Sequence, residues 1–450
     1  MAEQLTLNQR VEGSSPSRLT TPGDVAPPCE AGSPSLAAMP ETSAPALPDG
    51  TRLVHIGPYK TGTTAIQAAF HLARKSASRQ GVHYAGYGRQ PMTAVMAGIG
   101  KPSPWASNRK PPNRAVWRQL VGEIRGSDAR QVVLSSESFS DAEPDAIRRV
   151  VEELGNERVH IAVTLRPLAK VIPSQWQQYV QNRLVEPFDS WLDAILNRPR
   201  GTVTPTFWFR HRHDELIKRW VGVVGPDRVT AIVLDDRDHG LAYRAFEELT
   251  GLSAGTLVPD PQLSNRSMTL AEIEVIRAFN IAYKEAGLPP VLYQRVMRTG
   301  AAQLMERRAP AAAEGKVELP PWAVEPVGAI AQEIVAGIAG TGVRVVGDLS
   351  SLTRASTTRT DAEPIVNVSP DVAAAAAMGI LLASGLARGT AGAAPEPDDP
   401  EVSIDRPKPP RPIAEPSELF RVSTIQLGLV LFRRLRAAAT DRVSRVLRRG

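Results

Sequence analysis

Residues 53–69 read LVHIGPYKTGTTAIQAA, and this stretch decides the fold. An apolar run at 53–56 ends at Gly57, and a polar loop then leads into a segment with apolar residues at helical spacing. Glycines let a backbone approach an anion, and the first N–H groups and the dipole of a following helix favour negative charge. The stretch therefore predicts a strand, an anion-binding loop and a helix, with Lys60 adding a full positive charge.

Three later apolar runs have the composition of buried parallel strands, and helical patterns separate them. These runs are 131–134, 158–165 and 229–234. Such alternation predicts an α/β fold, a doubly wound parallel sheet flanked by helices. A ligand of this sheet lies beyond the carboxyl ends of its strands, and Lys60, Glu137 and Arg166 each follow such an end.

Arg166 and Ser174 form a second candidate pair. Arg166 closes the run 158–165, and Ser174 follows eight residues later in a helical pattern at 170–182. The two side chains can converge on one phosphate, the arginine through a forked charge-assisted pair and the serine through its hydroxyl. The alternative is an ordinary strand-end ion pair and a helical serine near a proline bend.

The loop GPYKTGTT at 57–64 resembles the loop with which PAPS-dependent sulfotransferases hold the 5′-phosphosulfate of 3′-phosphoadenosine 5′-phosphosulfate (PAPS). An arginine after a strand with a serine eight residues on resembles the 3′-phosphate signature of the same family. Residues 51–300 thus resemble a bacterial member, and the segment Asn265-Arg266-Ser267 adds a weaker likeness. The resemblance implies that the 5′-phosphosulfate is bound by Lys60, Thr61, Gly62, Thr63 and Thr64, and the 3′-phosphate by Arg166 and Ser174.

Transfer to a hydroxyl also needs a base that takes its proton. Glu137 stands at the strand end where the cytosolic members carry a catalytic histidine, so the resemblance makes it the first candidate. His83 is the second, because several carbohydrate sulfotransferases place a catalytic glutamate in the segment after the first helix. The structural alternatives are a helix cap or ion pair for Glu137 and a plain turn for His83.

Two other clusters of polar residues contain potential metal ligands, but we expect neither to bind a metal ion. His211 and His213 alternate beside Asp214, but no further ligands complete a site, so we expect a solvated or substrate-facing basic patch. Asp235 and Asp236 resemble a magnesium-binding pair of nucleotide triphosphatases. Because the loop lacks the GK[ST] pattern, we expect them to begin a loop.

Composition divides the chain into parts of different character. Residues 1–50 are rich in proline and poor in apolar periodicity, which predicts a disordered tail. The remaining parts are the sulfotransferase-like domain 51–300, a helical extension 301–390 that packs on the core, a Pro-rich linker 391–416 and a basic amphipathic helix 417–450.

Charge and composition limit the partners and the location. The net charge of +6 suits an anionic cofactor or a membrane surface and is too diffuse to indicate nucleic acid. Cys29 is the single cysteine, which excludes an intrachain disulfide. With neither a signal-peptide pattern nor a long apolar stretch, the sequence predicts a cytoplasmic protein. The arginine-rich segment 417–450 predicts either a peripheral contact with an anionic membrane or docking on the core or in a dimer.

The predicted function is transfer of a sulfuryl group from PAPS to a hydroxyl of an acceptor, of carbohydrate or glycolipid type. One alternative is another phosphate-loop enzyme, a kinase or a nucleotide triphosphatase. The other is a non-catalytic protein of the same fold that binds 3′-phosphoadenosine 5′-phosphate (PAP).

Overall fold

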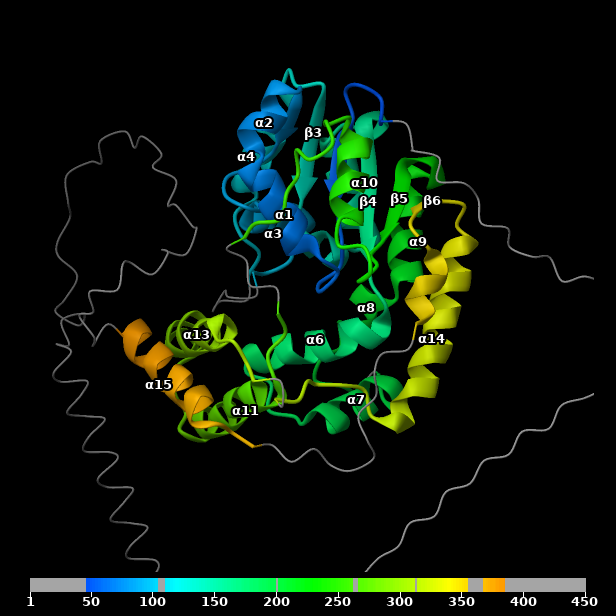
Figure 1. The fold of residues 1–450 in the computed structure, drawn as a ribbon. Coiled ribbons are helices and arrows are strands. Elements are labelled where there is room, and N and C mark those ends of the chain that lie inside the picture. Colours follow the sequence, from blue (N-terminus) through cyan, green and yellow to red (C-terminus); the bar gives the residue numbers. More distant parts are fainter. Residues whose placement is uncertain are drawn as a thin grey trace, which may run out of the picture.

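A six-stranded parallel sheet forms the centre of the computed structural model, in the order β2-β3-β1-β4-β5-β6 (Figure 1). The structure describes residues 46–103, 110–199, 201–261, 266–311, 314–354 and 367–384. The strands are β1 (Arg52–His55), β2 (Val82–Tyr84), β3 (Gln131–Ser135), β4 (Val159–Leu165), β5 (Val229–Val233) and β6 (Arg344–Val346).

Strand β1 lies between β3 and β4, with Val54 opposite Leu134 on one side and Ile161 on the other. The chain leaves β1 toward β2, whereas it leaves β3 toward β4. These connections therefore run in opposite directions, which opens a crevice for a ligand at the carboxyl ends of β1 and β3.

Helices cover both faces of the sheet, because apolar side chains of the buried strands point alternately to each face. On one face Phe70 and Phe246 pack with Leu53; the helices there are α1 (Thr63–Leu72), α2 (Arg74–Arg79) and α10 (Leu241–Thr250). On the other face Trp117 and Trp220 pack with Val54 in the larger core. The helices there are α3 (Met92–Ile99), α4 (Arg114–Arg125), α5 (Pro144–Glu153), α9 (His213–Val224) and α14 (Pro321–Ala339). The predicted parallel sheet flanked by helices is confirmed.

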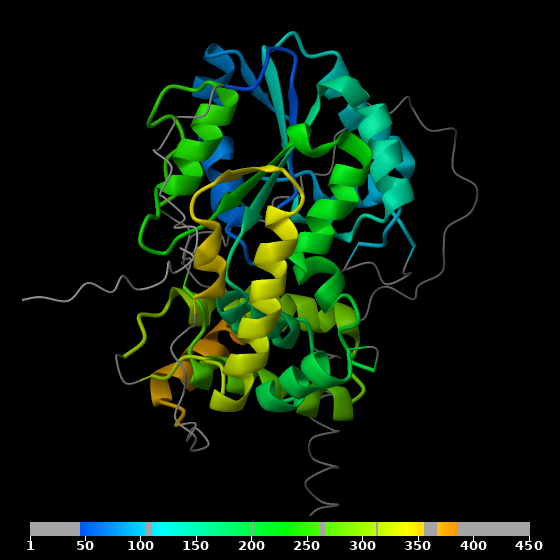
Figure 2. The ribbon, with the colours of Figure 1, turned by 90° about the vertical axis from the view of Figure 1, so that its right-hand side faces the viewer.

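A second group of helices, the helical layer, lies beneath the carboxyl edge of the sheet in both views (Figures 1 and 2). Gly300 and Gly379 bring two of its members together, since a Cβ on Gly300 would lie 2.6 Å from the Gly379 carbonyl oxygen. The layer consists of α6 (Leu168–Gln181), α7 (Phe188–Asn197), α11 (Leu270–Glu285), α12 (Pro290–Tyr293), the π-helix η4 (Gln294–Ala302), α13 (Gln303–Arg307) and α15 (Pro370–Ser384). Shorter elements are η1 (Glu137–Asp141), η2 (Asn156–Arg158), α8 (Phe207–His211), η3 (Pro226–Arg228) and η5 (Leu349–Thr353).

The ends of the predicted parts differ from the structure in two places. The described residues begin at 46, inside the predicted tail, where Leu47 is buried and its N–H donates to the Leu249 carbonyl at 3.0 Å. The predicted helical extension also contains β6, which pairs with β5. A strand of three residues gives too little alternation to be recognised from sequence.

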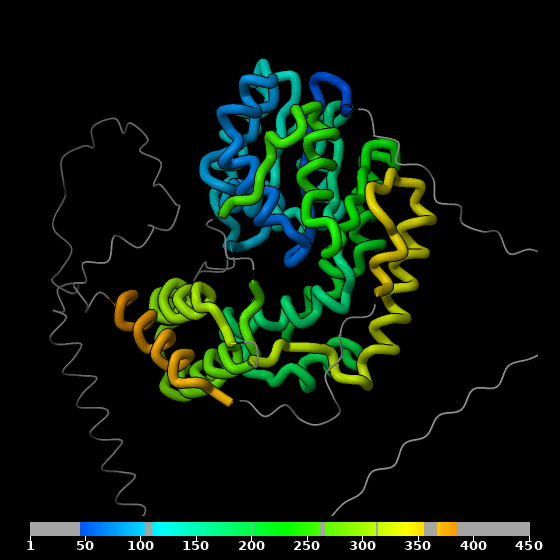
Figure 3. The backbone as a smooth tube through the Cα atoms, in the orientation of Figure 1, coloured from blue at the N-terminus to red at the C-terminus, as the bar shows by residue number. Residues whose placement is uncertain are grey.

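The C-terminal part of the described chain divides between two places, which the tube in Figure 3 shows most simply. Strand β6 forms one edge of the sheet, and α14, which precedes it, packs on α9 and α6, whereas α15 packs on η4 and α13 at the far side of the helical layer. The predicted linker 391–416, the predicted basic helix 417–450 and residues 1–45 lie outside the described residues. Within the described ranges, every helix is too short or too polar to span a bilayer.

Candidate functional site

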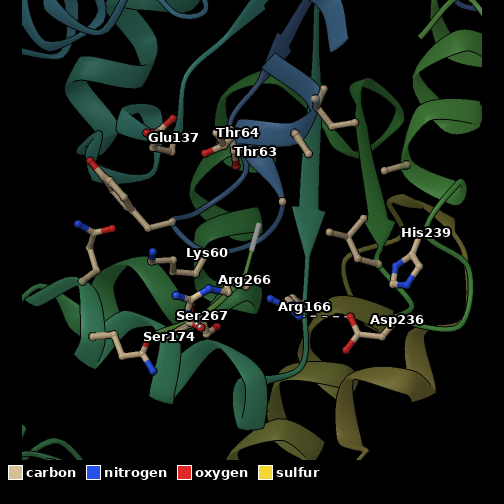
Figure 4. A pocket seen from close by; sticks show the side chains of 18 of the residues that line it. Lys60, Thr63, Thr64, Glu137, Arg166, Ser174, Asp236, His239, Arg266 and Ser267 are labelled. Atoms are coloured by element: carbon tan, nitrogen blue, oxygen red, sulfur yellow. Dashed lines mark hydrogen bonds and ion pairs between the residues drawn. The ribbon is translucent and has the colours of Figure 1, made fainter. Parts of the chain in front are cut away.

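A cavity of about 510 Å³ lies between the carboxyl ends of the central strands and the helical layer (Figure 4). Its wall combines the loop after β1, the segments after β3, β4 and β5, and side chains of α6 and α13. The structure brings most of the predicted site residues to this one cavity: Lys60, Gly62, Thr63, Thr64, Glu137, Arg166 and Ser174.

The loop after β1 presents its backbone to the cavity. Lys60 and Gly62 adopt left-handed φ angles of 68° and 80°, and Gly62 is the N-cap of the ten-residue helix α1. No acidic residue lies in the first turn of α1, and no described residue accepts a hydrogen bond from the N–H of Thr63 or Thr64. Such a helix start is a favourable place for an anion.

Thr61 differs from its neighbours because its side chain turns away from the cavity. It is fully buried, and its hydroxyl donates to the Pro58 carbonyl at 2.6 Å. Thr61 therefore supports the loop from beneath. The hydroxyl of Thr63, which does line the cavity, donates to the Gly57 carbonyl at 3.2 Å.

Lys60 sits in an environment of mixed charge. Burial lowers the pKa of its ammonium, and the carboxylates of Glu306 and Glu137 raise it against the opposing effects of Arg298 and Arg166. Glu306 lines the cavity from α13 and accepts a hydrogen bond from Gln181 Nε2 at 3.1 Å, and burial raises its pKa. Glu306 was not among the predicted site residues, because the sequence pattern of a short helix beyond residue 300 does not indicate which side of the helix faces the cavity.

Arg166 forms an ion pair with Asp236, which was not predicted from the sequence. Its Nη2 lies 3.2 Å from Oδ1 of Asp236, whose Oδ2 lies 3.7 Å from Nζ of Lys170. Arg166, Asp236 and, from α6, Ser174 all line the cavity. An anion bound by Arg166 must therefore compete with Asp236.

Glu137 lies across Lys60 from Arg166 and Asp236 in the view of Figure 4. Each of its carboxylate oxygens accepts an amide hydrogen bond, from Gln67 Nε2 at 3.0 Å and from Gln90 Nε2 at 3.2 Å. These two bonds fix the orientation of the carboxylate at that end of the cavity.

His83 does not reach the cavity. It lies on the edge strand β2, where its Nε2 is 2.8 Å from Oε1 of Glu123, and its side chain is one-third exposed. The hydrogen bond from His83 lowers the pKa of Glu123.

The prediction of a solvated or substrate-facing basic patch at His211 and His213 was wrong. Both side chains are fully buried, and burial lowers the pKa of His213 to about 4 and that of His211 well below its ordinary value. The two residues flank the junction of α8 and α9, which turns both rings toward the core. Among the residues that the structure describes, no three or more histidine, cysteine or acidic side chains gather as a metal site.

The remaining predicted residues are held by ion pairs. Arg266 donates to both carboxylate oxygens of Glu272 at 2.7 and 2.8 Å, and it lines the cavity with Ser267, whereas Asn265 lies outside the described residues. Asp235 starts a turn, as expected, and pairs with Arg237 at 2.7 Å and Arg354 at 3.0 Å. These contacts lower the pKa of Asp235.

No family model and no curated protein matches the chain. Among solved structures, the sulfotransferase from Alicyclobacillus acidocaldarius matches with a TM-score of 0.34 and 19% sequence identity. The match covers 54% of this chain and 95% of that one.

Proposed function

We propose that the protein is a PAPS-dependent sulfotransferase, which transfers the sulfuryl group of PAPS to a hydroxyl of an acceptor. One observation carries this proposal. Lys60, Arg166 and Ser174, which belong to separate segments of the sequence, line one cavity at the carboxyl ends of neighbouring parallel strands. That is where a ligand of such a sheet binds.

The loop after β1 fits the 5′-phosphosulfate end of PAPS. Its left-handed Lys60 and Gly62 leave the start of α1 open, and the N–H groups of Thr63 and Thr64 are directed to no acceptor among the described residues. Lys60 adds a charge close to these dipoles. A helix N-terminus with a nearby ammonium suits a group with spread negative charge.

Arg166 and Ser174 fit the 3′-phosphate. A guanidinium binds a phosphate dianion more strongly than a partly exposed carboxylate, because the phosphate has more charge and three acceptor oxygens. The side chains of Arg166 and Asp236 are 31% and 53% exposed, so their ion pair is weak enough to exchange.

PAPS, when bound, supplies an activated sulfuryl group. Lys60 would compensate the charge that develops on the leaving phosphate oxygen, as a preorganised charge does in a site shielded from water. Glu137, oriented by Gln67 and Gln90, would take the proton of the acceptor hydroxyl.

The Glu137 end of the cavity is the proposed acceptor site. Tyr59 and the amides of Gln178 and Gln181 line the cavity together with Glu137 and offer hydrogen bonds to several hydroxyls at once. This chemistry suits a carbohydrate or the sugar of a glycolipid. Contact of the arginine-rich segment 417–450 with an anionic membrane, proposed from its sequence, would bring a glycolipid within reach.

The test is the thermal unfolding midpoint of the full chain with PAP, 5′-AMP or Mg·ATP. A ligand at a hundred times its Kd stabilises by about 2.7 kcal/mol, so the ranking reports the site. We expect PAP to give the largest shift, Lys60→Ala to remove it, and the exposed Lys75→Ala on α2 to retain it. A shift with Mg·ATP alone would identify a kinase or nucleotide triphosphatase. PAP binding without sulfate transfer to any acceptor would leave a non-catalytic binding protein.

A further inference from the structure

His55, the last residue of β1, joins three neighbouring strands by hydrogen bonds. Its Nδ1 lies 2.9 Å from Oγ of Ser135 on β3, and its Nε2 lies 3.1 Å from Oγ1 of Thr164 on β4. All three side chains are fully buried, and the ring packs edge-to-face on Phe246 with centroids 4.9 Å apart. His55 was not among the predicted site residues, because a single histidine inside an apolar strand has no sequence pattern that indicates a role.

The same hydrogen bonds continue into the loop after β1. Thr164 Oγ1 lies 3.1 Å from Thr61 Oγ1, and the Thr61 hydroxyl lies 2.6 Å from the Pro58 carbonyl oxygen. A carbonyl only accepts, so Thr61 donates to Pro58, and Thr164 must donate to Thr61. It follows that His55 donates to Thr164 through Nε2–H. In a neutral ring Nδ1 then accepts from Ser135.

We propose that His55 is the positioning residue of this loop, which it holds through Thr164 and Thr61 in the conformation that presents Lys60 to the cavity. The identity of the ligand as a PAPS-like nucleotide rests on the proposed function. Lys60 has a left-handed φ of 68°, which an L-residue keeps only when its surroundings enforce it.

The packing beneath the loop supports this role. A Cβ on Gly57 would collide with Oγ1 of Thr164 and lie 2.8 Å from Nε2 of His55, so the histidine and threonine fill the space directly under the loop. His55 does not line the cavity, and it therefore acts through other residues rather than on a substrate.

The role of His55 does not depend on positive charge. Burial lowers the pKa of its imidazole to about 3, so the ring is neutral at physiological pH. A neutral ring with one donor and one acceptor is what the directed hydrogen bonds require.

The sheet offers a matched control. His160 on β4 lies with Nε2 2.8 Å from Oγ1 of Thr230 on β5, and both side chains are buried. This pair has the same chemistry as His55 and Thr164 but makes no hydrogen bond to the loop.

The experiment compares Thr164→Val with Thr230→Val in the full chain. The ligand is whichever of PAP, 5′-AMP and Mg·ATP raised the unfolding midpoint, so failure of the proposed function leaves this test intact. We expect both variants to lose stability, but only Thr164→Val to lose nucleotide affinity, by about tenfold in calorimetric Kd. Thr164→Ser, which restores the hydroxyl, should restore the affinity. Equal Kd values for the wild type and Thr164→Val would overturn the proposal.

A second measurement uses the wild-type protein, so it does not depend on the folding of a variant. The ¹⁵N spectrum of the wild-type imidazoles should show His55 neutral, with the proton on Nε2 and an unprotonated Nδ1. A proton on Nδ1, or a charged ring at pH 7, would contradict the hydrogen-bond order and with it the proposed role.

Discussion

The Nη2 atom of Arg166 lies 3.2 Å from Oδ1 of Asp236, an ion pair that spans the carboxyl ends of β4 and β5. The pair keeps the guanidinium at the wall of the cavity. It also places a negative charge beside the atom proposed to bind a 3′-phosphate, so Asp236 should oppose the ligand.

Asp236→Asn should therefore tighten PAP binding by a few-fold, because a partly exposed charge contributes up to about 1 kcal/mol. Arg166→Ala should weaken it by about tenfold to a hundredfold, the loss of a charged hydrogen bond. Isothermal titration with PAP and 5′-AMP checks both, since neither change should much affect AMP. Arg198→Ala, which removes an exposed pair with Asp193, is the control. If Arg166→Ala lost PAP and AMP affinity equally, Arg166 would not be the residue that binds the 3′-phosphate.

Glu137→Gln should leave the Kd for PAP unchanged and lower the rate of sulfate transfer by about 10²- to 10⁴-fold, the usual contribution of a general base. The amide keeps the shape of the side chain but cannot take a proton. Transfer of ³⁵S from labelled PAPS measures the rate. Glu143→Gln, at a half-exposed glutamate paired with Lys101, is the control. Full activity of Glu137→Gln would assign the base to another residue.

Gly57→Ala should destabilise the protein by about 1–3 kcal/mol, because the new Cβ collides with Thr164 beneath the loop. Gly222 on α9 provides the contrast, since a Cβ there meets no atom within 4 Å. Gly222→Ala should raise the free energy of unfolding by up to about 1 kcal/mol, the helix preference of alanine over glycine. Urea denaturation measures both, and a neutral Gly57→Ala would show that the loop can move away from β4.

Stability should fall as the pH drops below 6.5. Burial lowers the pKa of His55 to about 3, of His160 and His213 to about 4, and of His211 well below its ordinary value. Below pH 6.5 the unfolded chain therefore binds more protons than the folded chain, and this difference lowers the free energy of unfolding. Above pH 6.5 the histidines are neutral in both states, and the free energy of unfolding no longer depends on them. Each histidine contributes up to about 1.4 kcal/mol per pH unit.

Denaturation in urea at pH 7.5, 6.5, 5.5 and 5.0 measures this dependence. His160→Gln should reduce the slope of the free energy of unfolding against pH by the contribution of one histidine. An equal slope in the wild type and His160→Gln would show that His160 is charged in the folded state or exposed.

Much of the fold could be predicted because its signals are local. The runs that became β3, β4 and β5 are short and apolar, and the glycine-bounded loop after β1 marks a strand-to-helix turn. The meeting of Lys60, Glu137 and Arg166 followed from one rule, that carboxyl ends of parallel strands share an edge.

The features that were missed depend on which elements become neighbours. His211 and His213 look exposed in a basic segment, yet the turn between α8 and α9 buries them. The pairing of Asp236 with Arg166 requires β5 beside β4, and the place of Glu306 requires α13 to lie across from the loop. No spacing within one segment contains such information.

The wall of the cavity and the edge of the sheet both extend past residue 300, the predicted end of the first domain. A shortened gene that stops there would encode β1 to β5 but would omit Glu306 of α13 and the strand β6. The shortest protein that keeps every described residue of the cavity wall ends after Glu306. The shortest that also keeps β6, which pairs with β5, ends after Val346. Attempts to trim the protein for crystals, or to graft its loop onto another scaffold, should respect these two positions.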